Sequence, residues 1–170
     1  MNPQEDGPKR AVTATLVKVL VHGRTDRGMR LEPYASRCVR AGELHELVAT
    51  DHTETDAGAR IDRVGFLGFA EITGAGVLDR GDEVWIGSRR VGVLLGFDAC
   101  HFPNHYNVLI HADPVPTGRD LALAAGEPLV FRQGRGADHI PASGDGRASD
   151  DGRALACPDG AGGDRLSEYP

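Results

Sequence analysis

A chain of 170 residues, 40% of them hydrophobic, is long enough for one domain with a single core and flexible ends. The net charge is −6 and no basic run is longer than Arg89-Arg90, so the clustered positive face that nucleic-acid binding requires is missing. The longest apolar run, residues 91–97, is far shorter than the roughly 20 residues of a membrane-spanning helix. We therefore expect neither a nucleic-acid partner nor a membrane association.

The start of the chain and the cysteines together indicate a compartment. The first residues are polar and lack the positive start and apolar core of a signal peptide. Cys38, Cys100 and Cys157 are odd in number and have no CxxC spacing, which argues against a disulfide framework. Both observations predict a cytoplasmic protein.

In chain order, the first elements alternate between strands and polar loops. Residues 1–10 are polar and are expected to form a flexible N-terminus. Residues 11–21 alternate apolar and small polar side chains, which predicts a strand. After the charged loop of residues 23–33, the apolar residues around 43–49 are irregularly spaced, and both a short helix and a strand fit them.

The strongest pattern follows in the middle of the chain. Residues 64–72 are apolar at both odd and even positions and include two glycines, which predicts a strand buried on both faces or bent. Further short strands are expected over residues 83–86, 91–97, 107–111 and 127–131. Short strands joined by Gly-rich turns predict a mostly-β, small β-barrel-like fold with short helical segments, rather than alternating βα units.

The composition changes near the C-terminus. Residues 134–170 are rich in Gly, Asp and Arg and hold few large apolar side chains. Such a segment cannot bury enough apolar surface to offset the entropy lost on ordering. The predicted organisation is a flexible N-terminus (1–10), one β-barrel-like domain (11–133) and a disordered tail (134–170).

The chemically richest segment is GFDACHFPNHYN at residues 96–107, where Asp98, His101 and His105 form a D-x2-H-x3-H pattern. Pro103 biases the residue before it toward an extended conformation, so we expect a loop that runs into a strand. Two imidazoles and a carboxylate are a common ligand set for zinc or non-haem iron. The pattern therefore predicts a divalent-metal site, Zn or Fe, held by these three residues.

Two other interpretations of the same segment stay open. In the first, His101 or His105 acts in metal-free acid–base catalysis and Asp98 orients the imidazole. In the second, the segment is structural, because Asp98 and Asn104 cap a tight loop through side-chain to backbone hydrogen bonds. The sequence does not decide between them.

Further candidate site residues come from strand alternation, which places His105, Asn107 and His111 on one face of the strand after the loop. His111 lies roughly 13 Å beyond His105 by strand rise, so it is expected to contact substrate rather than the same ion. Glu71 ends an apolar strand, and its carboxylate is a candidate general base. The side chains expected to contact substrate are Asn104, Asn107, His111, Phe97 and Tyr106.

Several features follow one another between residues 64 and 132. An apolar strand ends in Glu71-Ile72, and then come a Gly-rich turn at residues 76–82, a hairpin, a His-bearing loop and a Pro-Val-Pro at residues 114–116. This order resembles the glucitol/sorbitol-specific IIA component of the bacterial phosphotransferase system, which implies that family's small β-barrel-like fold. At the position of the family's phosphate-accepting histidine this chain has Phe69, so the resemblance implies the fold rather than phosphoryl transfer.

The pattern GFDxxHxPNHxN also resembles the signature of an uncharacterised bacterial family found in biosynthetic neighbourhoods, which implies a role with small molecules. We therefore predict a small-molecule enzyme of bacterial, specialised metabolism. It would be a lyase, isomerase or hydrolase for a small polar metabolite, using metal-assisted or acid–base chemistry. The alternatives are a non-catalytic small-molecule-binding protein and a degenerate phosphocarrier-like protein. Assembly into a homo-oligomer is left open.

Overall fold

The computed structural model describes residues 7–134, and this part of the chain contains twelve strands and no helix. The main sheet has eight strands, and seven of them form its ring: β1 (Val12–Val19), β5 (Leu44–Thr50), β7 (Val64–Gly74), β9 (Glu83–Ile86), β10 (Arg89–Asp98), β11 (Asn107–His111) and β12 (Pro128–Arg132). The other strands are short: β2 (Gly23–Arg24), β3 (Met29–Arg30), β4 (Ser36–Val39), β6 (Arg60–Ile61) and β8 (Gly76–Asp79). The mostly-β prediction is confirmed, whereas the short helical segments expected with it do not occur among residues 7–134.

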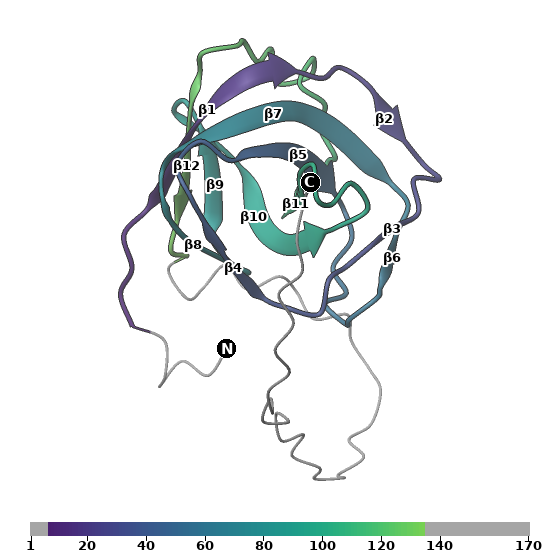
Figure 1. Ribbon diagram of the computed structural model, residues 1–170. Helices are drawn as coiled ribbons and strands as arrows, with labels where there is room; N and C mark the ends of the chain where they lie inside the picture. Colours follow the sequence, from purple (N-terminus) through teal and green to yellow (C-terminus); the bar gives the residue numbers. More distant parts are fainter. Residues whose placement is uncertain (1–6, 135–170) are drawn as a thin grey trace, which may run out of the picture.

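The main strands form a closed ring. They follow one another in the order β1, β12, β9, β10, β11, β5 and β7, and the ring closes because β1 also pairs with β7. Figure 1 looks into this ring, with the strands curving around a common centre. All pairings in the ring are antiparallel except that of β11 with β5, which is parallel. Closure gives the sheet an inner and an outer face.

The inner face of the ring holds the larger apolar core. Every one of the seven strands contributes to it, with Leu16 from β1, Leu67 from β7 and Phe131 from β12 among the fully buried side chains. Phe97 of β10 is also fully buried there, and its ring centroid lies 5.8 Å from that of Tyr34. This core fixes the curvature of the sheet and hence the positions of the strand ends.

A second core lies on the outer face, where β3 and β6 cover part of the ring. Met29 of β3 and Ile61 of β6 pack against side chains of β5, β7, β10 and β11. In β5, Leu47 therefore belongs to the inner core and Val48 to the outer one, and all residues of the strand except its first are buried. Burial on both faces removes the polar–apolar alternation of an ordinary strand, which is why residues 43–49 also fitted a helix.

The ring and its outer cover lie within residues 11–133, the segment predicted as the domain. The structure does not describe residues 1–6 and 135–170, so the flexible N-terminus (1–10) and the disordered tail (134–170) stay predictions, and only residues 7–10 and 134 of these segments are described. Among the residues that the structure describes, no helix is long and apolar enough to cross a membrane.

The inner core gives a stability prediction. Phe97→Ala removes a fully buried ring and leaves a cavity, so it should lower the free energy of unfolding by about 3–5 kcal/mol. Phe102→Ala is the matched control, since Phe102 is 62% exposed and its truncation should change that free energy by less than about 0.5 kcal/mol. Urea denaturation measures both. Equal effects of the two substitutions would contradict the assignment of Phe97 to the core.

Candidate metal centre

The loop between β10 and β11 folds back on itself and brings two histidines together. The amide of Phe102 donates to the carbonyl of Ala99 at 2.9 Å. The amide of Asn104 donates to the carbonyl of His101 at 2.9 Å, and the amide of His105 approaches the same oxygen at 3.4 Å. As a result, His101 Nδ1 lies 3.0 Å from His105 Nε2. The structure thus joins the two histidines that the sequence singled out.

Glu46 of β5 completes the cluster. The parallel register of β5 and β11 pairs Glu46 with Asn107, so its side chain lies beside the end of the loop. Glu46 Oε2 is 3.9 Å from His101 Nδ1 and 3.8 Å from His105 Nε2, and the three candidate ligand atoms lie within 4.8 Å of one another. Sequence analysis did not identify Glu46 as a site residue.

The Glu46 carboxylate is buried, and one of its oxygens is unpaired within the described part of the chain. The residue is only 6% exposed, and Oε2 has no hydrogen-bond partner among residues 7–134. A buried carboxylate oxygen without a partner is costly, because it has given up water and received nothing in exchange. This oxygen faces two imidazole nitrogens, and a carboxylate with two imidazoles is a donor set that can hold a divalent cation.

The backbone of Tyr106 holds the loop against β5 from two sides. Its carbonyl accepts a hydrogen bond from the amide of Glu46 at 3.1 Å. Its amide donates to His45 Nδ1 at 3.4 Å. Because Tyr106 directly follows His105, these two bonds fix the position of the His105 ring relative to the Glu46 carboxylate.

His105 is held in the state that a metal ligand needs. Burial lowers the pKa of His105, and the neighbouring His101 ring lowers it further, while Glu46 acts in the opposite direction. The ring packs edge-on against Phe69, at a centroid distance of 5.3 Å. Phe69 pairs with Glu46 across β7 and β5, so one aromatic side chain shields both groups from water. A neutral imidazole offers the lone pair that coordinates a metal.

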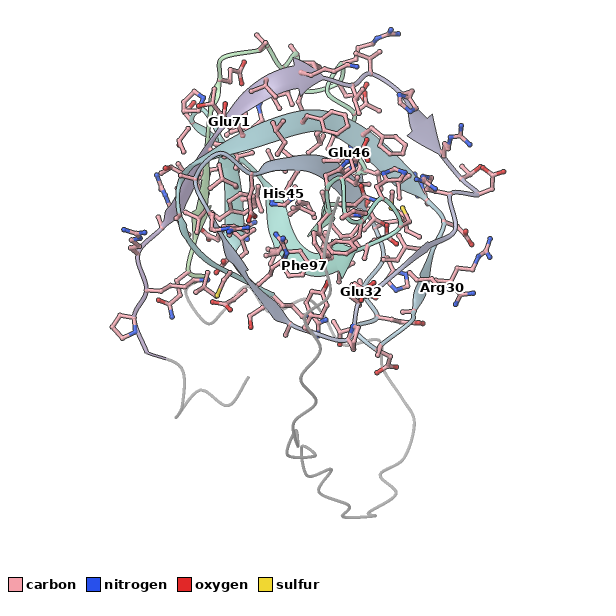
Figure 2. All side chains as sticks on the ribbon, viewed as in Figure 1. Arg30, Glu32, His45, Glu46, Glu71 and Phe97 are labelled. Carbon is pink, nitrogen blue, oxygen red and sulfur yellow. The ribbon has the colours of Figure 1, made fainter. Side chains whose placement is uncertain are left out.

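His45 supports the cluster from the inner face of the ring. Figure 2 shows His45 near the centre of the ring and Glu46 to its right, as expected for neighbours on a strand. His45 Nε2 lies 3.1 Å from Glu43 Oε2 and 3.1 Å from Arg37 Nη1. Burial lowers the pKa of His45, which favours a neutral ring. Nδ1 then accepts a hydrogen bond from the Tyr106 amide, and Nε2 carries the proton and donates a hydrogen bond to Glu43 Oε2. Arg37 Nη1 donates to the same carboxylate oxygen at 3.4 Å.

Asp98 was predicted as the third metal ligand, and the structure places its carboxylate elsewhere. It accepts hydrogen bonds from the amide of Arg30 at 2.9 Å, from Asn107 Nδ2 at 2.7 Å and from the amide of Cys100 at 3.2 Å. Burial alone would raise the pKa of Asp98, but the bonds from Cys100, Arg30 and Asn107 outweigh it and hold the pKa below its ordinary range. Asp98 ends β10 and caps the loop, while Glu46 takes the position expected of it beside the histidines.

Two of the expected substrate contacts are buried instead. Asn107 is fully buried and its side chain is used by Asp98 and by Cys100 Sγ, which lies 3.3 Å from Nδ2. Phe97 belongs to the inner core because the irregular pairing near Gly96 turns its side chain into the ring. Both side chains are buried, although Asn107 Oδ1 has no hydrogen-bond partner among residues 7–134.

The remaining predicted residues lie outside the cluster of Glu46 and the two histidines. Glu71 is exposed on β7, opposite Leu44, and His111 at the far end of β11 contacts the His52 carbonyl at 3.1 Å. Asn104 is exposed in the loop turn. The ring of Tyr106 packs against the Arg37 guanidinium, with its centroid 4.0 Å from Arg37 Cζ. Tyr106 contacts the residues around the cluster through its backbone.

The cap formed by Asp98 gives a second stability prediction. Asp98→Ala leaves buried donors unpaired and should lower the free energy of unfolding by about 1–3 kcal/mol at neutral pH. Because the folded pKa is lowered, this contribution is present above the unfolded value of about 3.9 and is lost as the pH falls through the folded pKa. Asp113→Ala, at an exposed aspartate, is the control. A pH-independent effect of Asp98→Ala on urea stability would contradict this role.

Comparison with known proteins adds the family. A model described as a family of unknown function, DUF6917, matches residues 6–132, which include the whole ring, the loop and all three members of the cluster. No curated protein and no solved structure matches the chain. The resemblance to the phosphotransferase IIA component therefore stays a prediction. Because the matched segment spans more than half of its length, the chain belongs to the DUF6917 family of unknown function.

Proposed function

We propose that this protein is a metal-dependent enzyme that acts on a small polar molecule, with a divalent transition metal bound by Glu46, His101 and His105. The observation that carries the proposal is the buried Oε2 atom of Glu46, which lacks a hydrogen-bond partner and lies 3.8–3.9 Å from two imidazole nitrogens. A bound cation would provide the missing interaction.

The spacing of the three atoms supports one shared ion. Ligands about 2.0–2.2 Å from a zinc ion in tetrahedral geometry lie roughly 3.3–3.6 Å apart. The three separations here are 3.0, 3.8 and 3.9 Å, which bracket this value. Small rotations of the His101 and Glu46 side chains are enough to bring all three atoms onto one ion. Two imidazoles and one carboxylate suit zinc or non-haem iron(II).

The number of ligands favours catalysis over a structural role. Structural zinc sites are closed by four protein ligands, whereas catalytic sites use three and leave a position for water or substrate. Here three residues converge, and the His101 side chain is 41% exposed, so the site opens to solvent. A bound ion would supply Lewis-acid polarisation of a carbonyl or an activated water, which fits hydrolase, lyase or isomerase chemistry.

The chain supplies the positioning around such an ion. The Tyr106 backbone fixes His105 against Glu46, and Phe69 excludes water from one side of both groups.

Cys38 and Cys100 are free thiols, which supports a reducing, cytoplasmic setting. Metal-free acid–base catalysis is the second candidate, favoured by the direct 3.0 Å contact between the two imidazoles.

The first test of the proposal is metal content. Purified protein incubated with zinc and then dialysed should retain one equivalent by elemental analysis. Glu46→Gln, His101→Ala and His105→Ala should each weaken zinc binding by at least about 100-fold, since loss of a supporting contact alone costs up to that much. Glu71→Gln and His111→Ala are matched controls outside the cluster and should bind zinc normally.

If the wild-type protein retains no zinc and no iron, the metal proposal is wrong and acid–base catalysis becomes the leading candidate. If Glu71→Gln loses the metal and Glu46→Gln keeps it, the metal binds at Glu71 on β7 and not at the proposed cluster.

The pH dependence of zinc affinity gives an independent test. Protons compete with the metal for imidazole lone pairs, so affinity should be nearly constant above the ordinary imidazole pKa of about 6.5 and fall below it. Because the pKa of His105 is lowered, protonation of that ring sets in only at a pH below this value. Competition with a zinc chelator across this range measures the profile. Affinity that rises as the pH falls would contradict ligation by the histidines.

A further inference from the structure

We infer that the substrate of this site carries an oxyanion, a carboxylate or a phosphate, that binds between the Arg27 guanidinium and the His101 ring. The inference rests on the proposed metal site and names the class of molecule that the site accepts. It comes from the hydrogen-bonding requirements of the second nitrogen of His101, which the metal would not use.

The metal-free arrangement is internally consistent. Arg27 Nη2 lies 3.4 Å from His101 Nε2, and a guanidinium can only donate, so Nε2 must accept. The His101 proton is then on Nδ1, from which it donates to His105 Nε2 at 3.0 Å. Each of these three groups has a suitable partner in this state.

Metal binding would reverse these roles. His101 Nδ1 faces Glu46 and His105, so it would give its lone pair to the ion and the ring proton would move to Nε2. A metal-bound histidine normally donates this second N–H to a carboxylate, a carbonyl or a water. Among residues 7–134, however, Nε2 contacts only Arg27, which is itself a donor. Two N–H groups would then face each other without an acceptor.

The charges lead to the same requirement. Arg27 has no carboxylate partner among the described residues, and its other side-chain contact is the Cys100 sulfur at 3.7 Å. The nearby carboxylate of Asp62 is already taken by Arg60 and by the amide of Gly28. A divalent ion, Glu46 and Arg27 together would leave a local charge of about +2 on a protein whose net charge is −6.

An oxyanion satisfies both conditions at once. One of its oxygens would accept from Arg27 and from His101 Nε2–H, and its charge would compensate the excess positive charge. The planar guanidinium is well suited to carboxylate and phosphate groups, and the exposure of His101 and Cys100 leaves this side of the loop accessible. The position lies beside the ion rather than on it, so the substrate would present a second group to the metal.

Calorimetric titration of zinc-loaded protein with acetate, methyl phosphate and acetamide tests the inference. One or both anions should bind and the neutral amide should not, and the tighter anion identifies the chemical group. Arg27→Gln should weaken anion binding at least about tenfold while keeping one equivalent of zinc. Arg27→Lys should retain part of the affinity. Arg30→Gln is the matched control, because Arg30 is exposed nearby and contributes only its backbone amide to Asp98. Metal-free protein should bind the anion at least about tenfold more weakly.

Normal anion affinity in zinc-loaded Arg27→Gln protein would overturn the inference and leave the metal site standing. Equal binding of acetamide and acetate would overturn it as well. A wild-type protein without zinc after loading would instead remove the proposed function, and with it the basis for the oxyanion site. Zinc content, measured on every sample, separates these results.

Discussion

The parallel pairing of β11 with β5 is the constraint on which the candidate site depends. It is the single parallel contact in a ring whose other pairings are antiparallel, and it aligns Glu46 with Asn107. A parallel neighbour cannot be reached by a tight hairpin, so the two strands come from distant parts of the chain. Their register places a carboxylate of one strand beside the loop that leads into the other. A shift of this register by one residue would replace Glu46 by an apolar neighbour or by His45.

Because β5 is buried on both faces, each of its polar side chains needs a partner inside the protein. His45 points into the ring and is satisfied by the Glu43 carboxylate and the Tyr106 amide. Glu46 points to the outer face, where one carboxylate oxygen has no partner. Two adjacent buried polar groups with such different surroundings indicate different roles. His45 holds the loop through the Tyr106 amide, and Glu46 is the carboxylate of the proposed metal site.

The sequence predicted the β-rich domain and the two histidines, and it failed where long-range pairing decides the outcome. The apolar run of β7 and the compact loop around Pro103 are local features, so their signals are visible in the chain itself. Along the chain, three strands of the ring, β7, β9 and β10, lie between Glu46 and His101. The two residues are neighbours only in the folded protein, so no local sequence pattern links them. Asp98 had the right spacing for a ligand, but the amide of Arg30 in β3 and the amide of Cys100 in the loop donate to its carboxylate. Local spacing therefore identified the two histidines that lie together, but not the carboxylate that lies beside them.

In the proposed centre Glu46, rather than Asp98 or Cys100, joins the two histidines around one ion. X-ray absorption spectroscopy of the zinc-loaded wild-type protein and of Glu46→Gln tests this claim most directly. The wild type should show two imidazoles and oxygen at about 2.0–2.1 Å with no sulfur near 2.3 Å, and Glu46→Gln should lose this signal together with the metal. A sulfur ligand, or an unchanged spectrum in Glu46→Gln, would contradict the proposed centre.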